Sequence, residues 1–550
     1  MAFPLLTVTA AVPALGALVT AAVPAARREA AKRLALGVSL VTLALAVVQL
    51  VRFDTGSTAA FQLTESHAWI ADFGVRYELG VDGIAVVLIA LTALLVPFVM
   101  LSGWHDADAL ETPAEGGAAN RRWRPTQGFF ALVLMVEAMV VVAFEATDVF
   151  LFYIFFEAML IPLYFLIGGF GDRAGEGDAG APARRSAAAV KFLLYNLAGG
   201  LIMLAAVIGL YAVTAHQLGA GTFSLQEIVQ ARASGRLGFA TVTERALFLG
   251  FFFAFAVKAP LWPLHTWLPG AMGEATAPVA VLITAVVDKV GTFAMLRFCL
   301  QLFPEASKWA TPVIVALSLV SIVYGALLAV AQKEIKRLIA YASISHFGFI
   351  VLGIFAMTSQ GQGGATLYML NHGLSTAALL LVAGFLISRR GSRLVADYGG
   401  VQKVAPVLAG TFLVGGLATL SLPGLAPFVS EFLVLVGTFS RYPAAGVIAT
   451  LGIVLAALYV LVLYQRTMTG PVREGVRGMP DLRPRELAVV TPLIALLLFL
   501  GVYPKPVTDL VNPAVAHTMS QVGRVDPKPR VPVPDVPAQQ APVNDVEAAK

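Results

Sequence analysis

The stretch FYIFFEAMLIPLYFLIGGF, residues 152–170, is almost wholly apolar, yet it contains one carboxylate, Glu157. An apolar run of about 20 residues is typical of a helix that crosses a membrane. Asp148 marks the outer edge of this run, nine residues before Glu157. At about 1.5 Å per residue, Glu157 lies ~13.5 Å deep in a hydrocarbon layer of ~30 Å. Because a charge at that depth costs roughly 2.5–3.5 kcal/mol, it indicates a paired or working group.

The composition extends this reading to the whole chain. Of 550 residues, 58% are hydrophobic and 13% are charged, and the mean hydropathy is +0.80. Soluble domains carry about 25% charged residues, so the chain is a polytopic membrane protein. The net charge of +5 does not indicate nucleic-acid binding, because the basic residues fall in loops between apolar spans. The single cysteine, Cys299, excludes an intramolecular disulfide and a thiolate metal site.

Apolar periodicity predicts an all-α fold with about fourteen transmembrane helices. Their centres lie near residues 14, 43, 92, 136, 159, 200, 255, 285, 319, 347, 376, 421, 454 and 494. Alternate loops are rich in Lys and Arg, which is the cytoplasmic signature. These loops include RREAAKR (27–33), RRWR (121–124), Arg173 with RR (184–185), KEIKR (333–337), RRGSR (389–393) and residues 466–485. The pattern predicts that both termini lie outside the cytoplasm.

Two of the spans are interrupted by proline. The first break contains Pro260 and Pro263, and the second contains Pro423, Gly424 and Pro427. Proline removes a helical hydrogen bond and clashes with the preceding turn. Paired broken helices, here spans seven and twelve, indicate two inverted five-helix repeats, spans four to eight and nine to thirteen. The predicted segments are 1–125, 126–300 and 301–465, then 466–503 with the last helix, and a Pro-rich extramembrane tail, 504–550, expected to be extended and weakly ordered.

Further ionisable residues lie within the apolar spans. They are Glu157, Lys258, Asp288, Lys289, His346, His372 and Glu431. No spacing among them is typical of a metal site, and the chain has no phosphate-binding loop or nucleophile elbow. A buried acid–lysine pair that opens and closes changes the protonation of both partners, and histidine relays protons near neutral pH. Static ion pairs for Glu157, core packing for either histidine and a structural role for Asp288 remain open alternatives.

Five stretches containing these residues resemble the antiporter-like membrane subunits of respiratory NADH:quinone oxidoreductase, or complex I. The stretches are FFEAMLIPLYFLIGGFG, VKAPLWPLHTWLP, KEIKRLIAYASISHFGFI, LNHGLSTAALLL and LPGLAPFVSEFLVLVG. The resemblance, which is strongest to the subunit M branch, covers roughly residues 80–500. It implies proton translocation driven by quinone reduction elsewhere in the complex.

The resemblance also assigns roles to individual residues. Glu157 and Lys258 match the ion pair of the first half, and Lys289 matches the central lysine. His346 and His372 match the histidines that link the half-channels. Glu431 matches the exit-side acid of span twelve; subunit M carries glutamate there, whereas subunits L and N usually carry lysine. Asp288 replaces a usually apolar residue and is a candidate for tuning Lys289.

The resemblance implies no cofactor in this chain. NADH, FMN, iron–sulfur clusters and quinone are expected in partner subunits, and the neighbours are expected to be subunits L and N in a bacterial inner membrane. In HTWLPGAM, Gly270 and Met272 replace polar groups that are usual in the family. A cation/proton antiporter component, a membrane hydrogenase subunit and a passive membrane scaffold are the alternatives.

Overall fold

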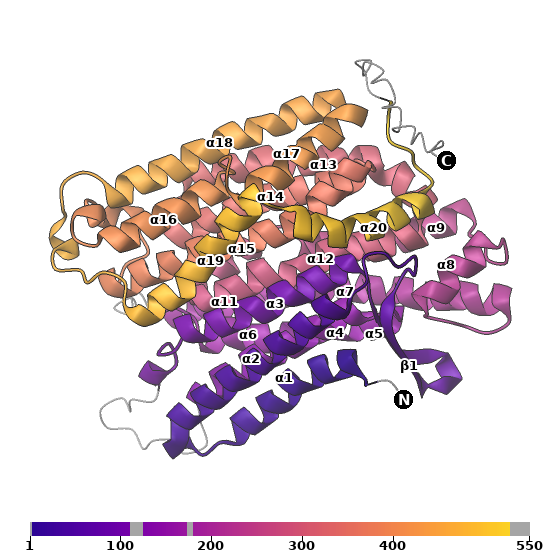
Figure 1. Ribbon diagram of the computed structural model, residues 1–550, viewed down its shortest axis with the longest axis horizontal. Helices are drawn as coiled ribbons and strands as arrows, with labels where there is room; N and C mark the ends of the chain where they lie inside the picture. Colours follow the sequence, from indigo (N-terminus) through magenta and orange to yellow (C-terminus); the bar gives the residue numbers. More distant parts are fainter. Residues whose placement is uncertain (1–2, 111–124, 173–179, 529–550) are drawn as a thin grey trace, which may run out of the picture.

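The computed structural model describes residues 3–110, 125–172 and 180–528, and it forms one helical bundle (Figure 1). Twelve segments in this part of the chain are long and apolar enough to cross a membrane. They are α1 (Leu5–Ala22), α2 (Arg28–Arg52), α3 (Gly83–Ser102), α4 (Pro125–Glu145), α5 with α6 (Val149–Ala158 and Leu160–Gly169), α7 (Ala181–Leu218), α11 to α12 and onward (277–300), α13 (Pro304–Ala331), α14 (Ile335–Phe355), α15 (Ser359–Arg390), α18 (Pro443–Met468) and α19 (Pro484–Val502).

The two breaks that the prolines predict are present. In the first, α9 (Thr241–Lys258) stops before Pro260, and α10 (Leu268–Glu274) resumes beyond Pro263. In the second, α16 (Pro406–Thr419) is separated from α17 (Ala426–Arg441) by the segment that contains Pro423. Counting these segments, the chain has between twelve and fourteen candidate spans. Irregular backbone at membrane depth is tolerated where it is buried in protein or lines a water-filled cavity.

Three segments form the centre of the bundle. The segment 277–300 is completely buried, and α14 and α15 are almost so. The helix in 277–300 is not regular: α11 (Ala277–Val281) and α12 (Asp288–Ala294) are joined and followed by π-helical turns, Leu282–Val287 and Met295–Leu300. The outer helices α1, α2 and α18 instead expose large apolar side chains, as expected for a surface in contact with lipid.

The bundle has one face on which both described ends of the chain lie (Figure 1). The backbone of Leu6 near the N-terminus donates to Glu65 in a β-hairpin, β1 (Gln62–Ile70) with β2 (Val75–Val81). These antiparallel strands are the exception to the all-α prediction among the described residues. The helix α8 (Leu225–Ala233) lies beside the hairpin, where Ser224 donates to Glu78.

The predicted tail begins with an ordered helix. Residues 505–522 form α20 (Lys505–Val522), which packs on α3 and α15. The expectation of an extended segment is therefore wrong here, because Val511, Val515, Met519 and Val522 recur at helical spacing and are buried. Residues 529–550 lie outside the described part of the chain.

The opposite face carries the basic loops. There the backbone of Ile335 donates to Arg393, and Arg389 forms an ion pair with Glu486 at 2.6 Å. The loops 333–337, 389–393 and 466–485 contact one another here. The turn between α1 and α2 lies at the same end of the bundle, opposite the described ends of the chain (Figure 1). The RRWR loop and Arg173 lie outside the described residues.

Candidate functional site: a buried series of proton-exchanging groups

The first part of the site is formed by Glu157 and Lys258. Helix α5 ends at Ala158, one residue after Glu157, since Pro162 cannot donate a hydrogen bond to the carbonyl of Ala158. Lys258 is the last residue of α9 and is 1% exposed. Its Nζ donates to the carbonyl of Phe156 at 3.0 Å and lies 4.2 Å from the centre of the Phe156 ring. The lysine therefore binds the backbone beside Glu157.

The carboxylate of Glu157 has no hydrogen-bond partner within the described part of the chain. It presses instead against Gly200 of α7, where a Cβ atom would overlap both carboxylate oxygens. The neighbouring Gly199 lets α7 approach Ala254 and Val257 of α9. This glycine pair thus brings α5 and α9 to the same helix. The ion pair implied by the family resemblance is open in this structure, because Lys258 binds a carbonyl rather than the Glu157 carboxylate.

Asp288 connects the first part of the site to the centre. It is completely buried, and neither carboxylate oxygen has a hydrogen-bond partner among the described residues. It lies within electrostatic range of both Lys258 and Lys289. The two lysines lie on different broken or irregular helices, so Asp288 is the acidic group placed to act on both.

Lys289 and His372 meet at the centre of the bundle. Lys289 Nζ lies 2.7 Å from His372 Nδ1 and donates to the carbonyl of Thr284 at 2.9 Å. The Phe347 ring lies 4.3 Å from the same ammonium. Lys289 stands between two π-helical turns, an irregularity that is frequent at functional sites.

The series continues from His372 to Glu431. The rings of His372 and His346 are 5.3 Å apart. His346 Nδ1 lies 2.6 Å from the hydroxyl of Tyr368, which donates to Glu431 at 3.2 Å. Ser421 donates a second hydrogen bond to Glu431. Ser421 is in the left-handed region, with φ of 61°, at the break in span twelve, so a strained residue holds the acid.

The structure joins four of the seven sequence-predicted residues, Lys289, His372, His346 and Glu431, by successive contacts. It places Lys258 beside Glu157 and Asp288 directly before Lys289, and it adds other residues. Tyr368 and Ser421 were not predicted, nor was Tyr459, whose hydroxyl lies 3.4 Å from His346 Nε2. Nothing in the sequence distinguishes these hydroxyls from others in apolar helices. Glu137 of α4 was also missed, although it is a completely buried carboxylate in an apolar run, the signal that identified Glu157.

This arrangement suits proton transfer. From Lys289 through the two histidines and Tyr368 to Glu431, successive groups can donate and accept a proton. Among the described residues, no group of three or more His, Cys, Asp or Glu side chains could hold a metal ion. Broken helices around a buried series of acids, lysines and histidines define a class, the membrane proteins that move protons or other cations through their interior.

Comparisons with known proteins assign the chain within that class. Residues 146–456 match the family model described as NADH:quinone oxidoreductase/Mrp antiporter, TM. NADH-quinone oxidoreductase subunit M of Mycobacterium tuberculosis is 57% identical over 98% of both chains. The chain therefore belongs to the NADH:quinone oxidoreductase/Mrp antiporter family, as a proton-translocating membrane subunit of the subunit M type.

Solved structures agree on the fold. A chain of respiratory complex I from Thermus thermophilus has a TM-score of 0.80 at 29% identity, covering 94% of this chain and all of that one. A chain of the Mrp complex from Dietzia has a TM-score of 0.77 at 23% identity, covering 95% and all of the respective chains. The second likeness concerns the fold alone.

Proposed function

We propose that the buried series from Glu157 to Glu431 is the path along which this subunit moves protons, coupled to quinone reduction elsewhere in the complex. The observation that carries the proposal is the continuous set of contacts from Lys289 through His372, His346 and Tyr368 to Glu431. Burying ionisable groups in a membrane is costly, so a static scaffold would not be expected to retain this many.

Within this proposal, Glu157 and Lys258 form a pair that opens and closes. The observed open state supports it, because Lys258 already has an alternative acceptor in the Phe156 carbonyl. Asp288 lies within electrostatic range of both lysines, so a change in its ionisation would couple the state of Lys258 to that of Lys289. A proton released at Lys289 then has His372 as its nearest acceptor.

The wider assignment follows from the relatives. We place the chain in a bacterial inner membrane beside the antiporter-like subunits L and N, with both termini outside the cytoplasm. NADH, FMN, iron–sulfur clusters and quinone belong to partner subunits in this proposal, and this chain holds no redox cofactor. Spans four to eight and nine to thirteen form two inverted repeats, each with one broken helix.

The proposal is tested at Lys289. Arginine keeps a positive charge but cannot be deprotonated in proteins. Lys289→Arg should therefore assemble yet lose proton pumping and NADH oxidation together, whereas Lys403→Arg on the exposed loop face should retain both. The measurement is made on membrane vesicles and normalised to assembled complex. Full pumping by assembled Lys289→Arg would refute proton release at this lysine.

A further inference from the structure

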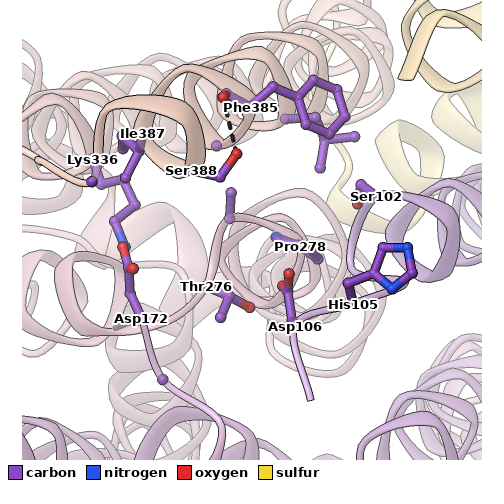
Figure 2. A pocket seen from close by; sticks show the side chains of 15 residues that line it. Ser102, His105, Asp106, Asp172, Thr276, Pro278, Lys336, Phe385, Ile387 and Ser388 are labelled. Carbon is purple, nitrogen blue, oxygen red and sulfur yellow. Dashed lines mark hydrogen bonds and ion pairs between the residues drawn. The ribbon is translucent and has the colours of Figure 1, made fainter. Parts of the chain in front are cut away.

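A cavity of about 380 Å³ lies beside the basic loops 333–337 and 389–393 and is lined by both apolar and charged residues (Figure 2). Its walls come from the end of α3, the loop after α6, the start of α11, the start of α14 and the last turns of α15. Among the described residues, its lining holds two carboxylates, Asp106 and Asp172, the ammonium of Lys336 and the imidazole of His105, whose Nδ1 lies 2.8 Å from Asp108. None of these four lining residues is part of the buried series described above.

The charges of the cavity favour a cation over an anion. Lys336 is completely buried and forms an ion pair with Asp172, and it donates to the carbonyl of Ala275 at 2.6 Å. Asp172 therefore has its counter-ion. Figure 2 shows Asp106 on the other side of the cavity, beside the hydroxyl of Thr276. Asp106 is thus the carboxylate of the cavity that does not pair with Lys336.

Asp106 lies in the loop after α3, outside the membrane-spanning segments. Burial and the neighbouring charge of Asp172 raise the pKa of Asp106 to about 6. The positive charges of Arg485 and Lys336 act in the opposite direction. A carboxyl group in this range exchanges protons with water near neutral pH.

Two of the cavity walls lead to the centre of the site. The segment that starts with Ala277 at the cavity continues to Lys289. Helix α15 lines the cavity at Leu381 and carries His372 nine residues earlier in the chain, closer to the centre. Nine helical residues span about 13.5 Å. His372 Nε2 is buried and has no hydrogen-bond partner in the described part of the chain. The inner end of this route is therefore a ring nitrogen whose hydrogen-bonding capacity is not used by the described residues.

Buried hydroxyl groups lie between the cavity and the lysine–histidine pair on the same two segments. Thr284 precedes Lys289 by five residues, and its carbonyl accepts the Lys289 hydrogen bond. On α15, Ser375 and Thr376 lie between His372 and Leu381 and are 3% and 2% exposed. Each hydroxyl can both donate and accept a proton or hold a water molecule.

We propose that this cavity is the entrance through which protons from the basic-loop side reach Lys289 and His372, with Asp106 as the group that captures them. The inference rests on the proposed function, since it supplies protons to the same pair. It assigns Asp106 a role that the series from Glu157 to Glu431 does not contain.

The test uses the complete complex in inverted membrane vesicles, in which the basic-loop side faces the medium if the topology is as proposed. NADH oxidation and proton pumping are recorded from about pH 6 to about pH 8 and normalised to assembled complex. Asp106→Asn should approach the wild-type rate at low pH. At about pH 8, the pumping rate of Asp106→Asn should be about tenfold lower than that of wild type. The reason is that the proton concentration falls tenfold over one pH unit and the variant has no carboxylate to capture protons.

Two further variants separate proton capture from a structural effect. Asp106→Glu keeps a titrating group and should restore the wild-type pH profile, whereas Ser388→Phe fills the cavity and should slow pumping at every pH. Glu305→Gln, on an exposed turn of α13, is the control and should match wild type.

The inference is overturned if Asp106→Asn and Ser388→Phe both keep wild-type rates and pH profiles. The same vesicles are prepared with Lys289→Arg. If that variant stops pumping while the cavity variants do not, the entrance is wrong and the buried series stands. If Lys289→Arg pumps normally, the proposed function itself is wrong.

Discussion

Lys289 Nζ lies 2.7 Å from His372 Nδ1, and this contact joins the irregular helix of residues 277–300 to the long helix α15. It is the point at which the lysine-containing first half of the site meets the histidine-containing second half. Both residues are 1% exposed, so a proton that passes between them has no direct access to bulk water. The predictions below test the groups on either side of this contact.

Gly200→Ala tests the placement of Glu157. The added methyl group would overlap the carboxylate, and overpacking of this kind costs about 1–3 kcal/mol when side chains must move. We expect assembled complex with reduced coupled NADH oxidation. Adding Glu157→Asp should restore part of the activity, since aspartate is shorter by one methylene. Gly410→Ala, where a Cβ meets nothing within 4 Å, is the control; no loss in Gly200→Ala would contradict the placement.

Asp288→Asn tests electrostatic tuning of the two lysines. The carboxylate favours the charged form of a nearby ammonium, so its removal should let the lysines release protons in more acidic solution. We expect normal assembly and a pH dependence of pumping displaced towards lower pH. An unchanged pH profile would leave Asp288 with a packing role only.

Tyr368→Phe tests the connection between His346 and Glu431. The phenol hydroxyl contacts both residues, and loss of a hydrogen bond to a charged group costs about 1.5–3 kcal/mol. If that loss falls on the proton-transfer step, pumping decreases by about tenfold to a hundredfold. Tyr464→Phe on α18 is the matched control. Equal pumping rates for the two variants would remove Tyr368 from the path.

Reporter fusions test the orientation. A reporter fused after Lys550 should be active only outside the cytoplasm, and a reporter inserted near residue 475 only inside it. The expectation follows from the basic loops, which lie on the face opposite the described ends of the chain. Activity of both reporters on the same side would contradict the alternation of spans.

Much of the architecture could be predicted because membrane burial leaves a strong pattern. Apolar length gave the spans, and the prolines near residues 260 and 423 gave both breaks. The prediction of an extended tail is wrong over 505–522, where Val511, Val515 and Met519 recur at helical spacing and are buried although the segment contains prolines. The hairpin of residues 62–81 was also missed, since it depends on contacts with the N-terminal helix α1.

The candidate site, like the fold, could be predicted from the sequence only in part. Charged residues such as Glu157 and Lys289 could be identified, because a charge in an apolar run is rare. Tyr368 and Ser421 could not, since a hydroxyl in such a run is ordinary and only the folded chain places these two against Glu431. The open state of Glu157 and Lys258 is likewise a property of helix placement and not of the residue pattern.

The most direct test of the account is the replacement of Glu157 by glutamine and by aspartate. If Glu157 were a static tie, removal of its charge would strand a buried lysine at a cost of about 3–5 kcal/mol and chiefly impair assembly. If it exchanges protons, Glu157→Gln should assemble, because glutamine keeps the shape and Lys258 already binds the Phe156 carbonyl. NADH oxidation and vesicle acidification, normalised to assembled complex, should then fall together, while Glu157→Asp retains substantial activity. An assembled Glu157→Gln complex that pumps at the wild-type rate would contradict the account.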